Sequence, residues 1–207
     1  MRGPTQPAPR RDVPLTVVRE LLTAAADAVT AAQEAATGPG GARRLHITEQ
    51  VQLLLRLAAD TGARRGELDA LRSGDLHDRV LHIDRGVSAE VVTTTKTGRQ
   101  RRVTVGATTA LLWQQTRARW RRRLPPCQQL GPWMFSARPD HAMRLPAGTL
   151  GHWFATFVRQ HGHSEVCLHR LRHTVATVLV ADGHLLQAQQ RLGHDDPAAV
   201  LPCPAPA

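Results

Sequence analysis

The residues best suited to chemistry in this sequence are a histidine and an arginine that stand three positions apart. His169 and Arg172 lie in the stretch 168–182, where leucine and valine recur at helical spacing. On a helix, residues three apart lie one turn from each other on the same side. The arginine could donate a two-pronged pair of hydrogen bonds to an oxyanion, and the imidazole could add a hydrogen bond or a proton. The pair could hold a phosphate, although an isolated pair of this kind in a basic protein is more often a surface feature.

Three other blocks contain residues of the same chemistry. Arg64 lies in block 61–68, Lys96 in block 95–99 and His194 in block 191–194. Lys96 is the only lysine among 27 Lys+Arg residues. A leaving-group acid must give up a proton, which lysine does more readily than arginine. Lys96 therefore has the properties of a proton donor, unless it is an accidental lysine in a polar turn.

In their order and spacing, these four blocks resemble the tyrosine recombinase (phage integrase) family over residues 13 to 200. The resemblance implies that Arg64 and Arg172 clamp the scissile DNA phosphate and that Lys96 is the general acid. It also implies that His169 and His194 bind the phosphate and assist proton transfer. In the family reaction a tyrosine attacks DNA and forms a 3′-phosphotyrosyl link, with no metal or nucleotide cofactor. Guanidinium groups suit this reaction because negative charge grows on the phosphate in the transition state.

Other charged residues have weaker predicted roles. Glu67, three residues after Arg64, is expected either to brace that arginine or to be an ordinary surface carboxylate. Arginines near the predicted site are candidates for flanking DNA phosphates or are merely solvated; they are Arg65, Arg99, Arg101, Arg102 and the arginines of 117–123.

The sequence departs from the family pattern at the nucleophile. It contains no tyrosine, and the family position falls on Cys203 or Pro204. Cys203 could substitute chemically, but the proline-rich stretch 201–207 cannot form the helix that should hold a nucleophile. We expect a truncated or frame-shifted C-terminal end, and no core-binding domain before the catalytic domain.

The composition favours a polyanionic partner, double-stranded DNA above all. The chain has 27 Lys+Arg against 17 Asp+Glu and a formal net charge of +10. The alternative is a solvated basic surface. Three unpatterned cysteines and the lack of a long apolar run predict a cytoplasmic protein with neither a disulfide framework nor a membrane span.

The periodicity predicts an α+β fold, mainly helical with a small three-stranded antiparallel sheet. A lead-in at 1–12 and a loose tail at 197–207 flank one catalytic domain at 13–196, with loops at 38–41 and 125–146. Helices are expected at 15–36, 47–59, 64–71, 108–123, 150–160, 168–182 and 185–192, and strands at 80–83, 90–94 and 102–105. Lys96 would lie in the turn of the last hairpin, and Gly193 would end the last helix and direct His194 toward the site.

Two alternatives remain. A zinc site could use His161, His163, Cys167, His169 and His173, because the last two have the spacing of a metal-binding pair on a helix; no second ligand block follows, so we expect no metal. At the level of function, the chain is either a recombinase domain that cleaves poorly or not at all, or a non-catalytic DNA-binding module that modulates an intact tyrosine recombinase.

Overall fold

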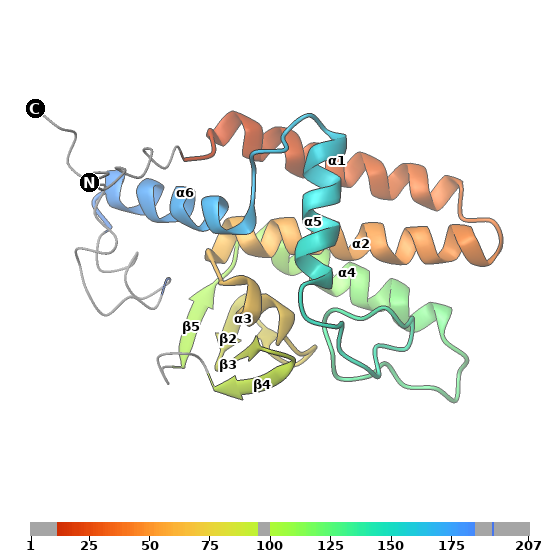
Figure 1. The fold of residues 1–207 in the computed structure, drawn as a ribbon. Helices are drawn as coiled ribbons and strands as arrows, with labels where there is room; N and C mark the ends of the chain where they lie inside the picture. The colour runs from red at the N-terminus through yellow and green to blue at the C-terminus, as the bar shows by residue number, and fades with distance from the viewer. Residues whose placement is uncertain (1–11, 95–99, 185–191, 193–207) are drawn as a thin grey trace, which may run out of the picture.

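The computed structural model describes residues 12–94, 100–184 and 192. Helices make up most of the fold, and the strands form two small antiparallel sheets on one side of them (Figure 1). This confirms the predicted fold class. The elements are α1 (Leu15–Glu34), α2 (Gly38–Thr61), α3 (Arg65–Asp69), β1 (Leu76–His77), β2 (Val80–Ile83), β3 (Arg85–Ser88), β4 (Val91–Thr94), β5 (Arg101–Thr104), α4 (Ala107–Arg123), α5 (Thr149–Gln160) and α6 (Leu168–Ala181).

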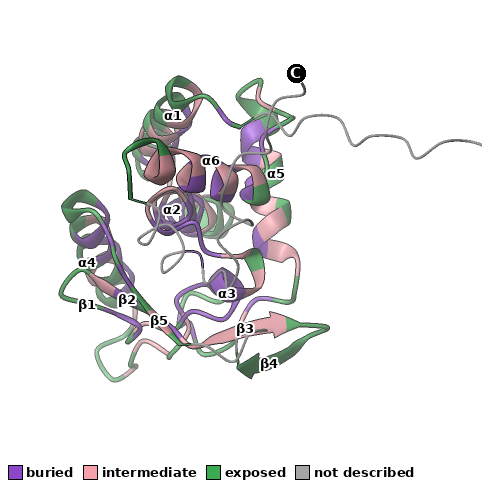
Figure 2. Ribbon diagram, turned by 90° about the vertical axis from the view of Figure 1, so that its left-hand side faces the viewer, coloured by how far each residue is buried: buried purple, intermediate pink, exposed green. Residues whose placement is uncertain are grey.

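Helix α2 is the centre of the helical layer. It contacts α1, α4, α5 and α6, and Figure 2 shows it between α4 and α5 with α1 and α6 above it. Four leucines of this helix, at positions 53, 54, 55 and 57, are buried. A helix that is apolar on several sides is expected where neighbours surround it. The second half of α2, up to Thr61, is therefore buried in the core.

The connection between α1 and α2 is shorter than expected. Residues 38–41 are helical, because α2 begins at Gly38 with Thr37 as its N-cap and a proline in its first turn. Proline fits there because the first amide nitrogens of a helix have no acceptor within the helix. The predicted loop at 38–41, and the predicted start of the second helix at Ile47, are therefore wrong.

The strands form two sheets rather than one. In the first sheet β2 pairs with β1 on one side and with β5 on the other, and Leu81 lies opposite Val103. The second sheet contains β3 and β4. The strand predicted at 90–94 thus pairs with β3 and not with the strand predicted at 102–105. The segment with Lys96 connects two sheets in the chain, which corrects the expected hairpin.

Two turns without glycine explain why β1 and β3 were not predicted. The β1–β2 turn contains Asp78 and Arg79, with φ of 44° and 67°, and the β3–β4 turn contains Ala89 and Glu90, with φ of 47° and 66°. Two successive left-handed residues suit the twist of a tight hairpin, and Asn-Gly or Asp-Gly usually supply them. The usual sequence signal is absent at both turns.

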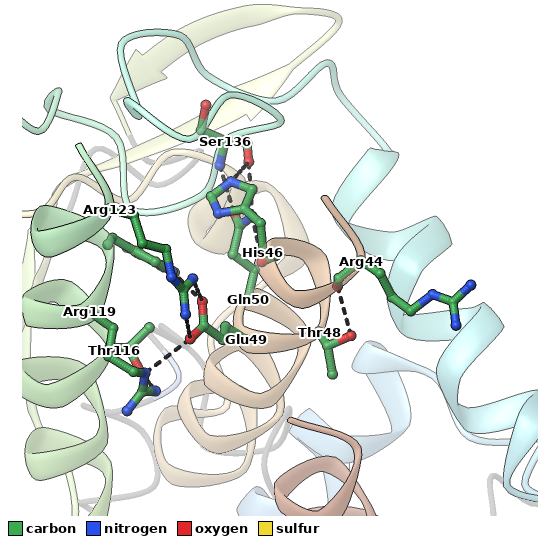
Figure 3. Close-up of polar contacts among 10 residues, drawn as sticks. Arg44, His46, Thr48, Glu49, Gln50, Thr116, Arg119, Arg123 and Ser136 are labelled. Carbon is green, nitrogen blue, oxygen red and sulfur yellow. Dashed lines mark hydrogen bonds and ion pairs between the residues drawn. The ribbon is translucent and has the colours of Figure 1, made fainter. Parts of the chain in front are cut away.

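A buried carboxylate fastens α4 to α2. Glu49 of α2 is fully buried and accepts hydrogen bonds from Arg119 Nε at 3.0 Å, Trp120 Nε1 at 2.8 Å and both amino groups of Arg123 at 2.7 and 3.0 Å (Figure 3). Buried carboxylates persist where hydrogen bonds and opposite charge offset their desolvation. Two of the arginines in the stretch 117–123 thus have a partner inside the protein.

The long stretch between α4 and α5 is tied to the same helix. The backbone oxygen of Ser136 accepts a hydrogen bond from Gln50 Nε2 at 2.9 Å and lies 3.0 Å from His46 Nε2, and the Ser136 amide donates to Gln50 Oε1 at 2.7 Å (Figure 3). His141 is fully buried, with its ring stacked on Trp120 at 4.1 Å. This loop, predicted at 125–146, is therefore part of the core.

The last two described helices, α5 and α6, confirm the helices predicted at 150–160 and 168–182. The helix predicted at 185–192 lies outside the described residues except for Leu192, and so do the lead-in, to residue 11, and the tail. No helix within the described ranges is long and apolar enough to cross a membrane.

Candidate phosphate-binding site

The turn after α2 positions Arg64. Gly62 ends α2 with a left-handed backbone, φ 58° and ψ 25°, and its amide donates to Ala58 O. The Thr61 hydroxyl accepts from the Ala63 amide at 3.1 Å and donates to Leu57 O at 2.6 Å. A Cβ on Gly62 would lie 2.7 Å from Leu192 Cδ2, so both conformation and space require glycine. Arg64 follows as the N-cap of α3.

Glu67 organises the residues around this turn. Its Oε1 accepts from Arg64 Nη1 at 3.3 Å and from Arg101 Nη1 at 2.8 Å. Its Oε2 accepts from the Arg64 amide at 2.6 Å and from Arg101 Nη2 at 2.6 Å. Although burial alone would raise the pKa of Glu67, hydrogen bonds and charge from Arg101 and the Arg64 amide hold it below its usual value. Of the two expectations for Glu67, the brace is confirmed.

Arg172 enters the same place from α6. Its side chain is buried, and it donates to Gly62 O at 2.6 Å and to the backbone oxygen of Leu192. It thereby joins α6 to the end of α2 and to a residue two positions before His194. Burial, together with the charge of Arg64, lowers the pKa of Arg172 to about 9.

We call Arg64, Glu67, Arg101 and Arg172 the arginine cluster. These groups are close enough for Arg64, Glu67 and Arg101 all to affect the pKa of Arg172. Three guanidinium groups around one carboxylate leave an excess of positive charge. Such an arrangement suits an anion with several oxygens, and phosphate is the common anion of this kind in proteins.

Helix α6 also carries His169, which is exposed while Arg172 is buried. His169 Nε2 lies 3.0 Å from His173 Nε2, with the two rings nearly perpendicular. The arrangement places an imidazole at the surface of the helix whose buried side contributes Arg172. Phosphate binding by His169 stays a prediction.

Several predicted site residues lie outside the described residues. These are Lys96, His194, Arg99 and Cys203. Among the predicted DNA contacts, Arg65 and Arg102 are exposed, and the aliphatic part of Arg65 lies against Gly151 of α5. The side chain of Arg101 is 8% exposed, and it pairs with Glu67. The burial of its side chain could have been predicted from strand alternation, because Arg101 shares a face with the buried Val103.

The zinc alternative finds little support. Within the part of the chain that the structure describes, no three His, Cys, Asp or Glu residues are grouped so that they could hold a metal. His161 Nδ1 lies 2.9 Å from Phe157 O, and His163 lies beside Glu20 and Glu165.

Comparison with solved structures finds the same fold in several recombinases. XerA recombinase matches with a TM-score of 0.67 and 18% identity over 96% of this chain and 60% of that chain. Tn1549 transposon integrase in complex with transposon right end DNA matches with a TM-score of 0.66 and 16% identity, over 96% and 62%. A lambda integrase dimer bound to a COC′ core site matches with a TM-score of 0.58 and 18% identity, over 96% and 62%.

The chain spans about three fifths of the length of these proteins. A search of the curated proteins gave no match. The family model described as "Phage integrase family" matches residues 24–201, which is most of the chain. This chain therefore belongs to the phage integrase family and has the fold of a tyrosine recombinase catalytic domain.

Proposed function

We propose that this chain is a DNA recombination domain that binds a phosphate of double-stranded DNA and does not cleave it unaided. The arginine cluster is the observation that carries this proposal. In it Arg64 and Arg172 would hold the non-bridging oxygens, with His169, Lys96 and His194 completing the site. Lys96 would protonate the leaving 5′-oxygen if cleavage took place.

The burial of the cluster supports phosphate as the ligand. Arg64 is the more accessible guanidinium, with 36% of its side chain exposed, whereas Arg172 is buried among backbone carbonyls. A phosphate at Arg64 would be close to low-dielectric protein, where charge-assisted hydrogen bonds are stronger than in water. DNA-bound structures among the similar proteins point to the same class of ligand.

DNA affinity tests the binding half of the proposal. Arg64→Ala should weaken binding to a short fluorescent duplex by about tenfold and reduce the slope of log affinity against log salt by about one. Arg19→Ala, which removes an exposed arginine of α1, is the charge-matched control and should have little effect. Equal losses in the two variants would mean that binding depends on net charge alone.

A suicide DNA substrate tests the cleavage half. The sequence contains no tyrosine, so the attacking group of the family reaction is missing, and we expect no covalent protein–DNA adduct. An adduct that disappears in Cys203→Ser would overturn the proposal and identify the cysteine as the nucleophile. The same assay with a 5′-bridging phosphorothioate, whose departing 5′-thiol religates poorly, extends the limit of detection.

The absent tyrosine also favours a second candidate, a DNA-binding module that modulates an intact tyrosine recombinase. Such a module would compete for the recombinase's DNA or join its assembly. Adding the chain to an intact relative should then reduce or redirect recombination on a plasmid substrate. No change at any ratio of the two proteins would eliminate this candidate.

A further inference from the structure

Arg101 has the charge of a DNA contact but the surroundings of an internal residue. It begins β5, and 8% of its side chain is exposed, against 36% for Arg64. Both of its amino groups donate to Glu67, at 2.8 and 2.6 Å. A DNA phosphate could reach its guanidinium only if this buried ion pair opened, which is costly.

We propose that Arg101 is a positioning residue, which acts through Glu67 to hold Arg64 in place for the phosphate. The inference rests on the proposed function, because it assigns a role within the same site. It differs from the expectation that Arg101 touches DNA, and it makes β5 a structural part of the arginine cluster.

Arg101 can position Arg64 because both donate hydrogen bonds to Glu67. Each oxygen of Glu67 accepts one hydrogen bond from Arg101 and one from Arg64. The planar guanidinium of Arg101 therefore fixes the plane of the carboxylate. Arg64 is bound to that carboxylate through both its amide and its side chain. If Arg101 is removed, the carboxylate is free to turn, and Arg64 turns with it.

Arg101 also acts through its charge, which offsets the charge of Glu67. Glu67 carries one negative charge, and its strongest partner is Arg101 rather than Arg64, whose side-chain bond is longer at 3.3 Å. Arg101 thus offsets the charge of Glu67 and leaves the charge of Arg64 available to an incoming phosphate. Without Arg101, the carboxylate would pair with Arg64 and compete with that phosphate.

Arg19→Ala provides the matched control. Arg19 has the same charge as Arg101, but it is exposed on α1 and is not among the predicted DNA contacts. A general loss of positive charge would affect both variants alike. A loss of positioning would affect Arg101→Ala only.

A double-mutant cycle on DNA affinity tests the proposal. Arg64→Ala and Arg101→Ala should each weaken duplex binding about tenfold, and Arg19→Ala by less than about threefold. In the Arg64→Ala background, Arg101→Ala should cost less than about a further twofold, because it acts through a residue that is already gone. Near-UV circular dichroism of the four tryptophans checks that each variant is folded.

Other outcomes separate the alternatives. An equal loss from Arg101→Ala in both backgrounds would show a direct DNA contact and overturn the proposal, as would no loss in the wild-type background. If Arg64→Ala leaves affinity unchanged, the proposed function itself fails, and the positioning role fails with it. If Arg101→Ala does not fold, Arg101→Lys replaces it in the cycle. This variant keeps the charge but loses the two-pronged geometry, and full wild-type affinity would then overturn the proposal.

Discussion

The guanidinium of Arg101 and the carboxylate of Glu67, 34 residues apart in the chain, form a two-pronged ion pair with N–O distances of 2.8 and 2.6 Å. The pair joins β5 to α3, a helix of only five residues. Such a short helix has little stability of its own. The orientation of Arg64, at the N-cap of α3, therefore depends on contacts made far away in the sequence.

Glu67→Gln should destabilise the protein strongly. The substitution keeps the shape of the side chain but leaves the buried Arg101 without its counter-charge, so we expect the free energy of unfolding to fall by about 3 kcal/mol. Urea unfolding followed by tryptophan fluorescence measures this change. Glu90→Gln is the control, because Glu90 also pairs with an arginine but is exposed; it should change the free energy far less. Similar changes in both variants would contradict a special role for the buried pair.

Gly66→Ala should separate α3 from β3. A Cβ on Gly66 would lie 2.5 Å from the backbone oxygen of Val87, so one of the two elements must move. We expect a loss of about 2 kcal/mol in the free energy of unfolding and weaker DNA binding, since α3 holds Arg64. Gly74→Ala is the matched control, because nothing lies within 4 Å of a Cβ there. Wild-type stability for Gly66→Ala would show that the contact between the two elements is loose.

Glu49→Gln should loosen the attachment of α4 to α2. Arg119 and Arg123 would lose their shared counter-charge, and the free energy of unfolding should fall by about 3 kcal/mol. The emission of Trp120, whose indole nitrogen donates to Glu49, should shift in the native state. Glu34→Gln, at the exposed end of α1, should change the free energy by less than about 0.5 kcal/mol. An unchanged emission spectrum would contradict the contact between Trp120 and Glu49.

His141 should make the protein sensitive to mild acid. Burial, with a contribution from the charge of His46, lowers the pKa of His141 to about 4, against 6.5 in the unfolded chain. The unfolded state therefore binds a proton between these pH values while the folded state does not, so stability falls as pH drops from 6.5 toward 4. The full effect is about 3 kcal/mol.

The control for this prediction is His141→Asn, which tolerates the positive φ of 54° at this position and does not titrate. Urea unfolding at several pH values should give a shallower dependence for this variant than for the wild type over the same range. Identical slopes would mean that the pKa of His141 does not differ between the folded and unfolded states.

The elements that sequence alone predicts well are those with a strong local pattern. Helices α5 and α6 have clear apolar periodicity, and α4 is a run without proline or glycine; each of the three lies within one or two residues of its expected bounds. The approach of Arg64 and Arg172 was expected from a family resemblance rather than from any local pattern. The predictions that failed depended on proline and glycine as signals for loops and turns. Proline and glycine at 38–41 begin a helix, and the turns at Asp78 and Ala89 adopt positive φ without glycine.

The ion pairs of Glu67 and Glu49 with arginines could not be predicted, for a different reason. Which arginine faces Glu67, and which two face Glu49, depends on how distant elements pack. In a chain with 26 arginines, local spacing cannot assign each one a partner. The face that Arg101 shares with Val103 is a usable signal that Arg101 is buried. The burial of Glu49 has no such signal, because it depends on which elements surround α2 in the tertiary structure.

The lowered pKa of Arg172 has a consequence for the energetics of the whole domain. Folding takes the guanidinium of Arg172 out of water and places it beside Arg64. The charged form therefore costs free energy in the folded state, and the pKa falls to about 9. Any anion that occupies the cluster relieves this repulsion, and it finds no equivalent site in the unfolded chain. Ligand-linked folding then follows: the melting temperature should rise with the concentration of a bound polyanion. On the proposed function, the cluster that would bind the phosphate lowers the stability of the fold until the phosphate is bound.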